Sequence, residues 1–183
     1  MIITLAGPIG SGKSTLARAI AATLGAPSAG FGNYVRSLAA ERGLDIERRH
    51  VLQDLGHELV QADARRFLDG ALAWSRHSAG QDLLLDGLRH MSILEALRQR
   101  EAEGLDAIVL LYLDTPVHIR RARVAARGVS PAQMEADEVH PAERDLDERL
   151  RAAADATLNG ALSPEALTEQ AVSIVEARRL RLT

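Results

Sequence analysis

The sequence has no cysteine, and aromatic residues make up only 3% of it. Without cysteine, the chain has no disulfide, no thiolate metal ligand and no cysteine nucleophile, which suits a reducing compartment. The apolar run after Met1 covers about five residues, too short for a signal sequence or a membrane span. A net charge of -3 gives no reason to expect a nucleic-acid partner. We therefore expect a cytoplasmic protein with neither membrane nor nucleic-acid partner, and leave open whether it is a monomer or a homodimer.

Lysine is nearly absent as well. Of the 22 basic residues, 21 are arginine, and the single lysine is Lys13. It lies in the stretch Gly7-Pro8-Ile9-Gly10-Ser11-Gly12-Lys13-Ser14, which matches G-x-x-x-x-G-K-[ST]. In such a loop the backbone N–H groups surround phosphates, the lysine reaches the β and γ oxygens, and the serine hydroxyl meets Mg²⁺. A compact ammonium fits between loop and phosphate where a planar guanidinium would not, so the motif predicts a nucleoside triphosphate site.

The residues around this loop provide the context that the motif needs. Residues 2–6 have the composition of a short buried strand, and residues 14–24 have the four-residue apolar spacing of a helix. A strand that leads through glycines into a helix directs amide hydrogens and the positive end of the helix dipole at one anion site. Gly7, Gly10 and Gly12 allow positive φ and a close approach of the backbone to phosphate.

Further along the chain, apolar runs alternate with helical patterns. At 183 residues the chain fits one domain. Strands are expected at 82–86, 107–113 and 156–158, and the segment 29–32 should bring the chain back across the top of the sheet. This alternation predicts an α/β fold, a doubly wound parallel sheet of about five strands that binds ligands at its C-terminal edge.

Several local expectations concern helix boundaries. Asn33 is expected to cap a helix that ends near Gly43, and residues 45–77 are expected to be helical almost throughout. Gly56 and Gly70 are expected to be breaks or bends. Asp114 and Thr115 are expected to cap a helix before Pro116, and Ser163 is expected to cap the last helix. Residues 129–147 are expected to form a mobile polar excursion.

Charged residues at the ends of the predicted strands indicate the chemistry. Asp86 ends a strand at the edge where the phosphates would lie, so with Ser14 it is the candidate Mg²⁺ ligand. Arg36 and Arg89 flank the same edge and suit the phosphate of a second substrate, because the guanidinium fork matches phosphate oxygens. Arg123 and Arg127 lie four apart beside the polar excursion and could close over the phosphoryl donor. These positions are typical of phosphoryl transfer.

Together these motifs resemble the nucleoside monophosphate kinases, P-loop NTPases of the nucleotide kinase type. The resemblance covers nearly the whole chain in order and is carried by Gly7 to Thr15, Phe31 to Arg36, Asp86-Gly87-Leu88-Arg89 and Arg123-x-x-x-Arg127. Arg49-x-x-Leu52-Gln53-x-Leu55-Gly56 and His140-Pro141-x-Glu143 look more like the deoxynucleoside monophosphate kinase branch. The segment 154–160 is similar to one shared with dephospho-coenzyme A kinases.

The resemblance implies a division of the chain and a set of roles. It implies one domain over 1–183, with a core of 1–30, 80–120 and 150–183, a helical acceptor-binding region at 31–79 and a small lid at about 121–149. It implies ATP and Mg²⁺ as cofactors. The implied nucleotide-binding residues are Gly7, Gly10, Ser11, Gly12, Lys13, Ser14, Thr15, Arg123 on the adenine and Asn159 near the base; the substrate residues are Asn33, Arg36, Gln53 and Arg89; the catalytic residues are Lys13, Asp86, Arg123 and Arg127.

Two alternatives to a nucleoside monophosphate kinase stay open. Dephospho-coenzyme A presents a hydroxyl that benefits from a carboxylate base, whereas a monophosphate is already anionic at neutral pH. Asn33, where the family usually has Asp, therefore favours a monophosphate, although Asp86 could serve as a base. Asn33 would also fit a P-loop nucleotide sensor that has lost turnover. Regulatory GTPases are excluded, because their N-K-x-D motif needs a lysine after Lys13.

Overall fold

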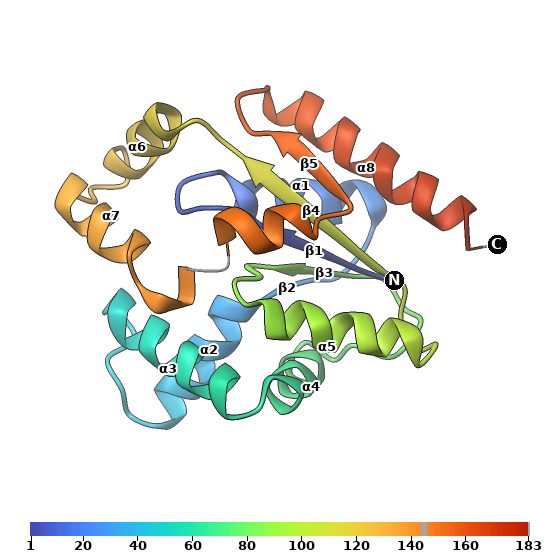
Figure 1. Ribbon diagram of the computed structural model, residues 1–183, viewed down its shortest axis with the longest axis horizontal. Coiled ribbons are helices and arrows are strands. Elements are labelled where there is room, and N and C mark those ends of the chain that lie inside the picture. Colours follow the sequence, from blue (N-terminus) through green and yellow to red (C-terminus); the bar gives the residue numbers. More distant parts are fainter. Residues whose placement is uncertain (144–145, 183) are drawn as a thin grey trace.

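The computed structural model describes residues 1–143 and 146–182. Five strands form one sheet: β1 (Ile2–Ala6), β2 (Ser28–Gly30), β3 (Leu83–Asp86), β4 (Ile108–Asp114) and β5 (Ala156–Asn159). Their order is β2-β3-β1-β4-β5, and every adjacent pair is parallel. The predicted α/β fold with a five-stranded parallel sheet is confirmed (Figure 1).

Helices cover both faces of the sheet, so its central strands are buried on both sides and have continuous apolar sequences. Ile3 and Leu5 of β1 face one core, which α1 (Lys13–Leu24) and α8 (Pro164–Leu180) cover. Ile2 and Ala6 face the other core. That core is covered by α2 (Phe31–Glu41), α3 (Arg49–Ala62), α4 (Ala64–Trp74) and α5 (Met91–Ala102), which lie on the opposite side of the sheet in Figure 1.

The chain between β4 and β5 forms a separate group of short helices. They are α6 (Val117–Ala125), α7 (Pro131–Glu138), the 3-10 turn η1 (Pro141–Glu143) and the π-helix η2 (Leu146–Leu150). The expectation of a polar excursion without a core was wrong for residues 131–143, because Ser130 caps α7 and the helix buries Met134 and Asp137. Residues 144 and 145, within the predicted lid, lie outside the described residues.

Several predicted helix signals have other roles. Asn33 is not a cap, because α2 begins two residues earlier, at Phe31. Gly56 and Gly70 are not breaks, since they lie inside α3 and α4. A Cβ on Gly70 would lie 2.2 Å from Tyr34 Oη, so this glycine lets α4 pack closely against α2. The break falls at Asp63, whose side chain accepts a hydrogen bond from Arg66 N and caps α4.

The predicted caps before α6 were also wrong. Thr115 does not cap the helix, because its hydroxyl donates to Ser11 O at 3.0 Å and is buried. Asp114 instead pairs with Arg151 at 2.6 Å. The capping prediction was correct for Ser163, which accepts from Ala166 N at 3.2 Å. Both residues, at and after the end of β4, thus have tertiary partners in place of a capping role, and the contact of Thr115 joins the end of β4 to the glycine loop.

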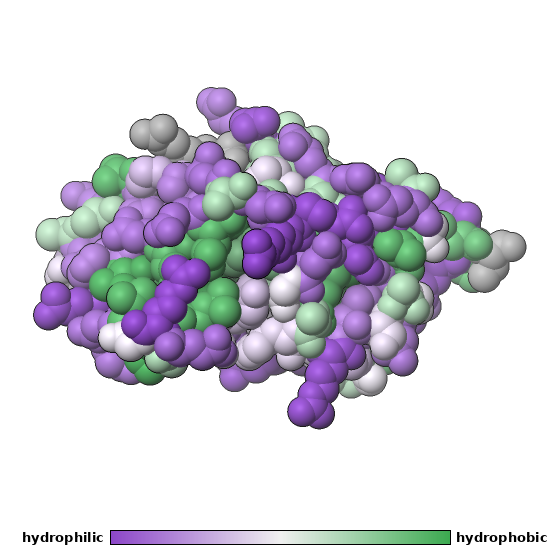
Figure 2. Space-filling model, turned by 90° about the horizontal axis from the view of Figure 1, so that it is seen from below, coloured by the Kyte–Doolittle hydropathy of each residue, from purple (hydrophilic) through white to green (hydrophobic). Residues whose placement is uncertain are grey.

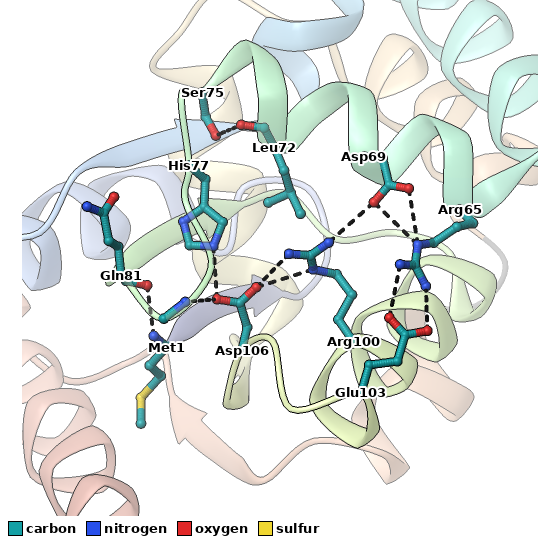
Figure 3. A network of polar contacts seen from close by, with 11 residues as sticks. Met1, Arg65, Asp69, Leu72, Ser75, His77, Gln81, Arg100, Glu103 and Asp106 are labelled. Atoms are coloured by element: carbon teal, nitrogen blue, oxygen red, sulfur yellow. Dashed lines mark hydrogen bonds and ion pairs between the residues drawn. The ribbon is translucent and has the colours of Figure 1, made fainter.

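A polar network closes the N-terminal edge of the sheet (Figure 3). The Asp106 carboxylate, fully buried, accepts hydrogen bonds from His77 at 3.0 Å, the Gly80 amide at 3.1 Å and Arg100 at 2.8 Å. Burial raises the pKa of Asp106, but the hydrogen bonds from Arg100, Gly80 and His77 outweigh it, so the pKa lies below its ordinary value. This carboxylate is a structural group, because Asp106 precedes the start of β4, whereas the glycine loop follows the end of the parallel strand β1, at the opposite edge of the sheet.

The outer face of α3–α5 is largely hydrophilic, with hydrophobic residues gathered toward the end of the molecule where α3 lies (Figure 2). In residues 1–143 and 146–182, every helix is too short or too polar to cross a membrane.

Candidate active site

The glycine loop follows β1 and opens α1 at the C-terminal edge of the sheet, as predicted. Gly7, Gly10 and Gly12 have φ values of 143°, 79° and 105°. The loop is also packed tightly from behind: a Cβ on Gly7 would lie 2.6 Å from Leu113 O, and one on Gly10 would lie 2.8 Å from Arg120 O. Glycine is therefore required here by both backbone conformation and space.

Lys13 folds back over this loop. Its Nζ donates to the main-chain oxygen of Gly7, to that of Pro8 at 2.8 Å and to Ser11 Oγ at 3.4 Å. Burial, followed by the positive charge of Arg89, lowers the pKa of Lys13 from 10.5 to about 7, although the charge of Asp86 acts in the opposite direction. An anion in the loop would reverse this shift, since an opposite charge favours the ammonium form. The side chain is therefore suited to receive phosphate oxygens.

Ser14 and Asp86 meet as the sequence predicted. Ser14 Oγ donates to Asp86 Oδ2 at 2.7 Å, which joins the start of α1 to the end of β3. Asp86 Oδ1 is buried and has no hydrogen-bond partner among the described residues. A buried carboxylate oxygen without a partner, beside a hydroxyl, fits the oxygen ligands that Mg²⁺ prefers. The donor set therefore suits Mg²⁺, although its role as a metal site stays a prediction.

A cleft of about 670 Å³ opens in front of these groups. The predicted substrate residues all line it, together with predicted donor-site residues; they are Asn33, Arg36, Gln53, Arg89, Lys13, Ser14, Asp86 and Arg127. Asn33 and Arg36 are exposed and contact each other at 3.4 Å, whereas Gln53 is buried. Burial lowers the pKa of Arg89 to about 10, with Arg49 as the next cause, while Asp86 acts in the opposite direction. Among the described residues the cleft is thus lined by several cations and by two carboxylates, Asp86 and Glu47.

The remaining predicted residues lie at the edges of the site. Arg123 donates to Ser11 O at 2.7 Å and to Gly160 O at 3.1 Å, so its guanidinium touches the back of the loop. Arg127 follows the end of α6 and is exposed in the cleft. Thr15 is exposed in the first turn of α1, and Asn159 Oδ1 accepts from Ala161 N at 3.0 Å at the end of β5. Their nucleotide-binding roles stay predictions.

Sequence reasoning did not single out three charged residues that reach the cleft region. Arg49 of α3 lines the cleft, and Asp137 and Glu143, from α7 and η1, form ion pairs with Arg49 and Arg89. Glu143 is part of His140-Pro141-x-Glu143, and Arg49 begins the motif that holds Gln53, so both stood in segments already noted for their resemblance. No periodicity marks Asp137.

Comparison with known proteins shows the family to which the chain belongs. Residues 3–150 match the family AAA_18, described as an AAA domain. The cytidylate kinase of Methanothrix thermoacetophila is 34% identical over 131 residues, which is 69% of this chain but 63% of that protein. The cytidylate kinase of Methanocella arvoryzae is 30% identical over 143 residues, 78% of this chain and 72% of that protein. The chain thus spans somewhat less than two thirds of the first of these relatives.

Among solved structures, a gluconokinase from Sinorhizobium meliloti 1021 has a TM-score of 0.64 and 18% identity, and the match covers 98% of this chain and 94% of that one. At this identity the likeness concerns the fold alone. The family match over 3–150 and the cytidylate kinase relatives identify the chain as a member of the AAA_18 family and of the P-loop nucleoside monophosphate kinases.

Proposed function

We propose that this protein transfers the γ-phosphoryl group of ATP, with Mg²⁺, to a nucleoside or deoxynucleoside monophosphate. The observation that carries the proposal is the meeting of Ser14 with Asp86 in the cleft that Lys13 and Arg89 also line. A triphosphate in the glycine loop and a second phosphate on Arg89 would then lie on two sides of one carboxylate. The relatives' name, cytidylate kinase, makes CMP the acceptor to test first, and dCMP tests the deoxy form of the same nucleotide.

The chain's own groups supply binding and charge neutralisation. Lys13 and the loop amides would hold the β and γ oxygens, and Arg89 and Arg36 the phosphate of the second substrate. Asp86 and Ser14 would hold Mg²⁺, which when bound supplies positive charge next to the transferred group. Because the dianionic monophosphate needs no base, the exposed amide of Asn33 is compatible with this reaction. Such positioned charges stabilise the spread negative charge of the transition state.

The two alternative functions differ from this one in the fate of the phosphoryl group. A dephospho-coenzyme A kinase would use a hydroxyl acceptor and would benefit from a carboxylate base; Asp86 is the candidate, and its Oδ2 already accepts from Ser14. A nucleotide sensor would bind ATP without turnover. The ion-paired, cation-lined half of the cleft favours an acceptor that carries a phosphate.

A coupled ADP-release assay tests the proposal. The panel is CMP, dCMP, UMP, dUMP, AMP and dephospho-coenzyme A, each with ATP and Mg²⁺. We expect turnover with at least one monophosphate, and a decrease of about 100-fold or more for D86N with an unchanged circular dichroism spectrum. Turnover with dephospho-coenzyme A alone, or ATP binding without turnover of any member, would contradict it.

A further inference from the structure

The chain that follows α6 places two buried carboxylates beside the arginines of the cleft that are proposed to bind the phosphoryl acceptor. The lid segment, defined here as residues 131–143 with α7 and η1, contacts α3 through η1. Asp137 and Glu143 of this segment are 5% and 8% exposed. A buried carboxylate is costly unless charged or hydrogen-bonding partners compensate for the lost water, so the partners of these two residues indicate what holds the segment in place.

Each carboxylate is paired with an arginine of the cleft. Glu143 accepts from Arg89 Nη1 and from Gln53 Nε2 at 3.3 Å, and its Oε1 lies 3.9 Å from Arg49 Nη2. Asp137 Oδ2 lies 2.9 Å from Arg49 Nε. Gln53 Nε2 also donates to the main-chain oxygen of Asp137 at 3.4 Å. Since both acceptors are oxygens, the amide must direct its nitrogen toward them. The lid segment is therefore attached through charged contacts.

These contacts occupy the groups on which a phosphoryl acceptor would bind. Arg89 lies three residues after Asp86, the last residue of β3, and lines the same cleft as Lys13. Arg49 lines the cleft as well. A carboxylate and a phosphate oxygen satisfy the guanidinium fork in the same way. A phosphate monoester carries a charge close to -2 at neutral pH. One such phosphate thus matches the charge of the two carboxylates that it would have to replace.

We propose that Asp137 and Glu143 are specificity-determining residues: they occupy Arg49 and Arg89 when no phosphoryl acceptor is bound, and only an acceptor that carries a doubly charged phosphate displaces them. This inference rests on the function proposed above. A neutral acceptor, such as a nucleoside without its phosphate, brings no charge to replace the carboxylates on these arginines. The lid segment thus selects for the anionic group and leaves the base and sugar to other residues.

The test compares E143Q with E135Q. Glu135 is on the same segment, is exposed and pairs with Arg121 at 3.7 Å, so E135Q removes one lid charge away from the cleft. For E143Q, we expect a KM for the best monophosphate about fivefold to tenfold below wild type, the effect of losing one competing charged hydrogen bond. We also expect little change in kcat, and E135Q should match wild type. An unchanged or raised KM in E143Q would overturn the inference.

A measurement on the wild-type protein covers the case in which E143Q fails to fold. Hydrogen exchange of residues 131–143 is followed while CMP, or cytidine as the control without phosphate, is added in the absence of ATP. We expect exchange to become faster with CMP and to stay the same with cytidine. Slower exchange with CMP, or an equal response to both, would overturn the inference. Absence of both monophosphate turnover and monophosphate binding in wild type would instead contradict the proposed function.

Discussion

Nucleotide binding should change the protonation of Lys13. Burial and the charge of Arg89 lower the pKa of the free side chain from 10.5 to about 7. Phosphate oxygens next to Nζ would raise the pKa toward its ordinary value, because an opposite charge at hydrogen-bond distance favours the ammonium form. The complex should therefore hold a proton on Lys13 that the free protein has partly lost. Binding is then linked to proton uptake.

The size of the uptake follows from the lowered pKa. With a pKa of about 7, roughly nine tenths of the free side chain is neutral at pH 8, so binding should take up about 0.9 proton there and about 0.1 proton at pH 6. Above pH 7 the affinity should fall as pH rises, approaching about tenfold per unit. The terminal phosphate of the ligand interferes little at pH 8, since phosphate monoesters have a second pKa of about 6.

Isothermal titration calorimetry measures this quantity directly. ATP with saturating Mg²⁺ is titrated at pH 6 and pH 8 in buffers of different ionisation enthalpy, and the slope of observed enthalpy against ionisation enthalpy gives the protons taken up. K13R and K13M are the matched variants, because neither side chain titrates in this range, and both should give a slope near zero at pH 8. A wild-type slope near zero at pH 8, or equal slopes at both pH values, would refute the reasoning.

Two further predictions concern stability. G10A should lower the free energy of unfolding by about 3 kcal/mol and weaken ATP binding, whereas G128A should lower it by about 1 kcal/mol and leave binding unchanged. Both glycines have φ near 80°, but only at Gly10 would a Cβ meet Val124 and Arg120. Equal losses of unfolding free energy in urea would contradict the packing explanation. D106N should cost about 3 kcal/mol at pH 7, since it breaks a buried charged pair. Because folding lowers the pKa of Asp106, its contribution to the free energy of unfolding is present above the ordinary pKa of 3.8 and is lost as pH falls through the pKa in the folded state. If the difference in unfolding free energy between wild type and D106N does not shrink between pH 7 and pH 3, this assignment is wrong.

Features coded by local sequence were predictable. The P-loop motif fixes the positive-φ glycines and the position of Lys13, and the apolar runs of β1, β3 and β4 identify strands buried on both faces. The meeting of Ser14 and Asp86 followed from the rule that neighbouring parallel strands end at one edge. Local signals were sufficient here because each depends on a few adjacent residues.

Features decided by tertiary packing were not predictable in this way. Gly70 has the sequence signature of a helix break, yet it is retained inside α4 because Tyr34 packs against it from another helix. Thr115 resembles a cap, but a partner 104 residues away in the sequence binds its hydroxyl. The ion pair between Arg89 and Glu143 joins residues 54 apart, and nothing in the composition of either segment indicates which partner it has.

The two hydrogen bonds of Arg123 limit how the lid segment can swing. This side chain fastens α6 to the glycine loop through Ser11 O and to the turn after β5 through Gly160 O. An opening motion that keeps both hydrogen bonds must rotate about a point after Arg123. Gly128 is suited to be that hinge, because its φ is 80° and the space around it is open. The moving part would then be shorter than the predicted 121–149, and α6 would stay with the body of the protein.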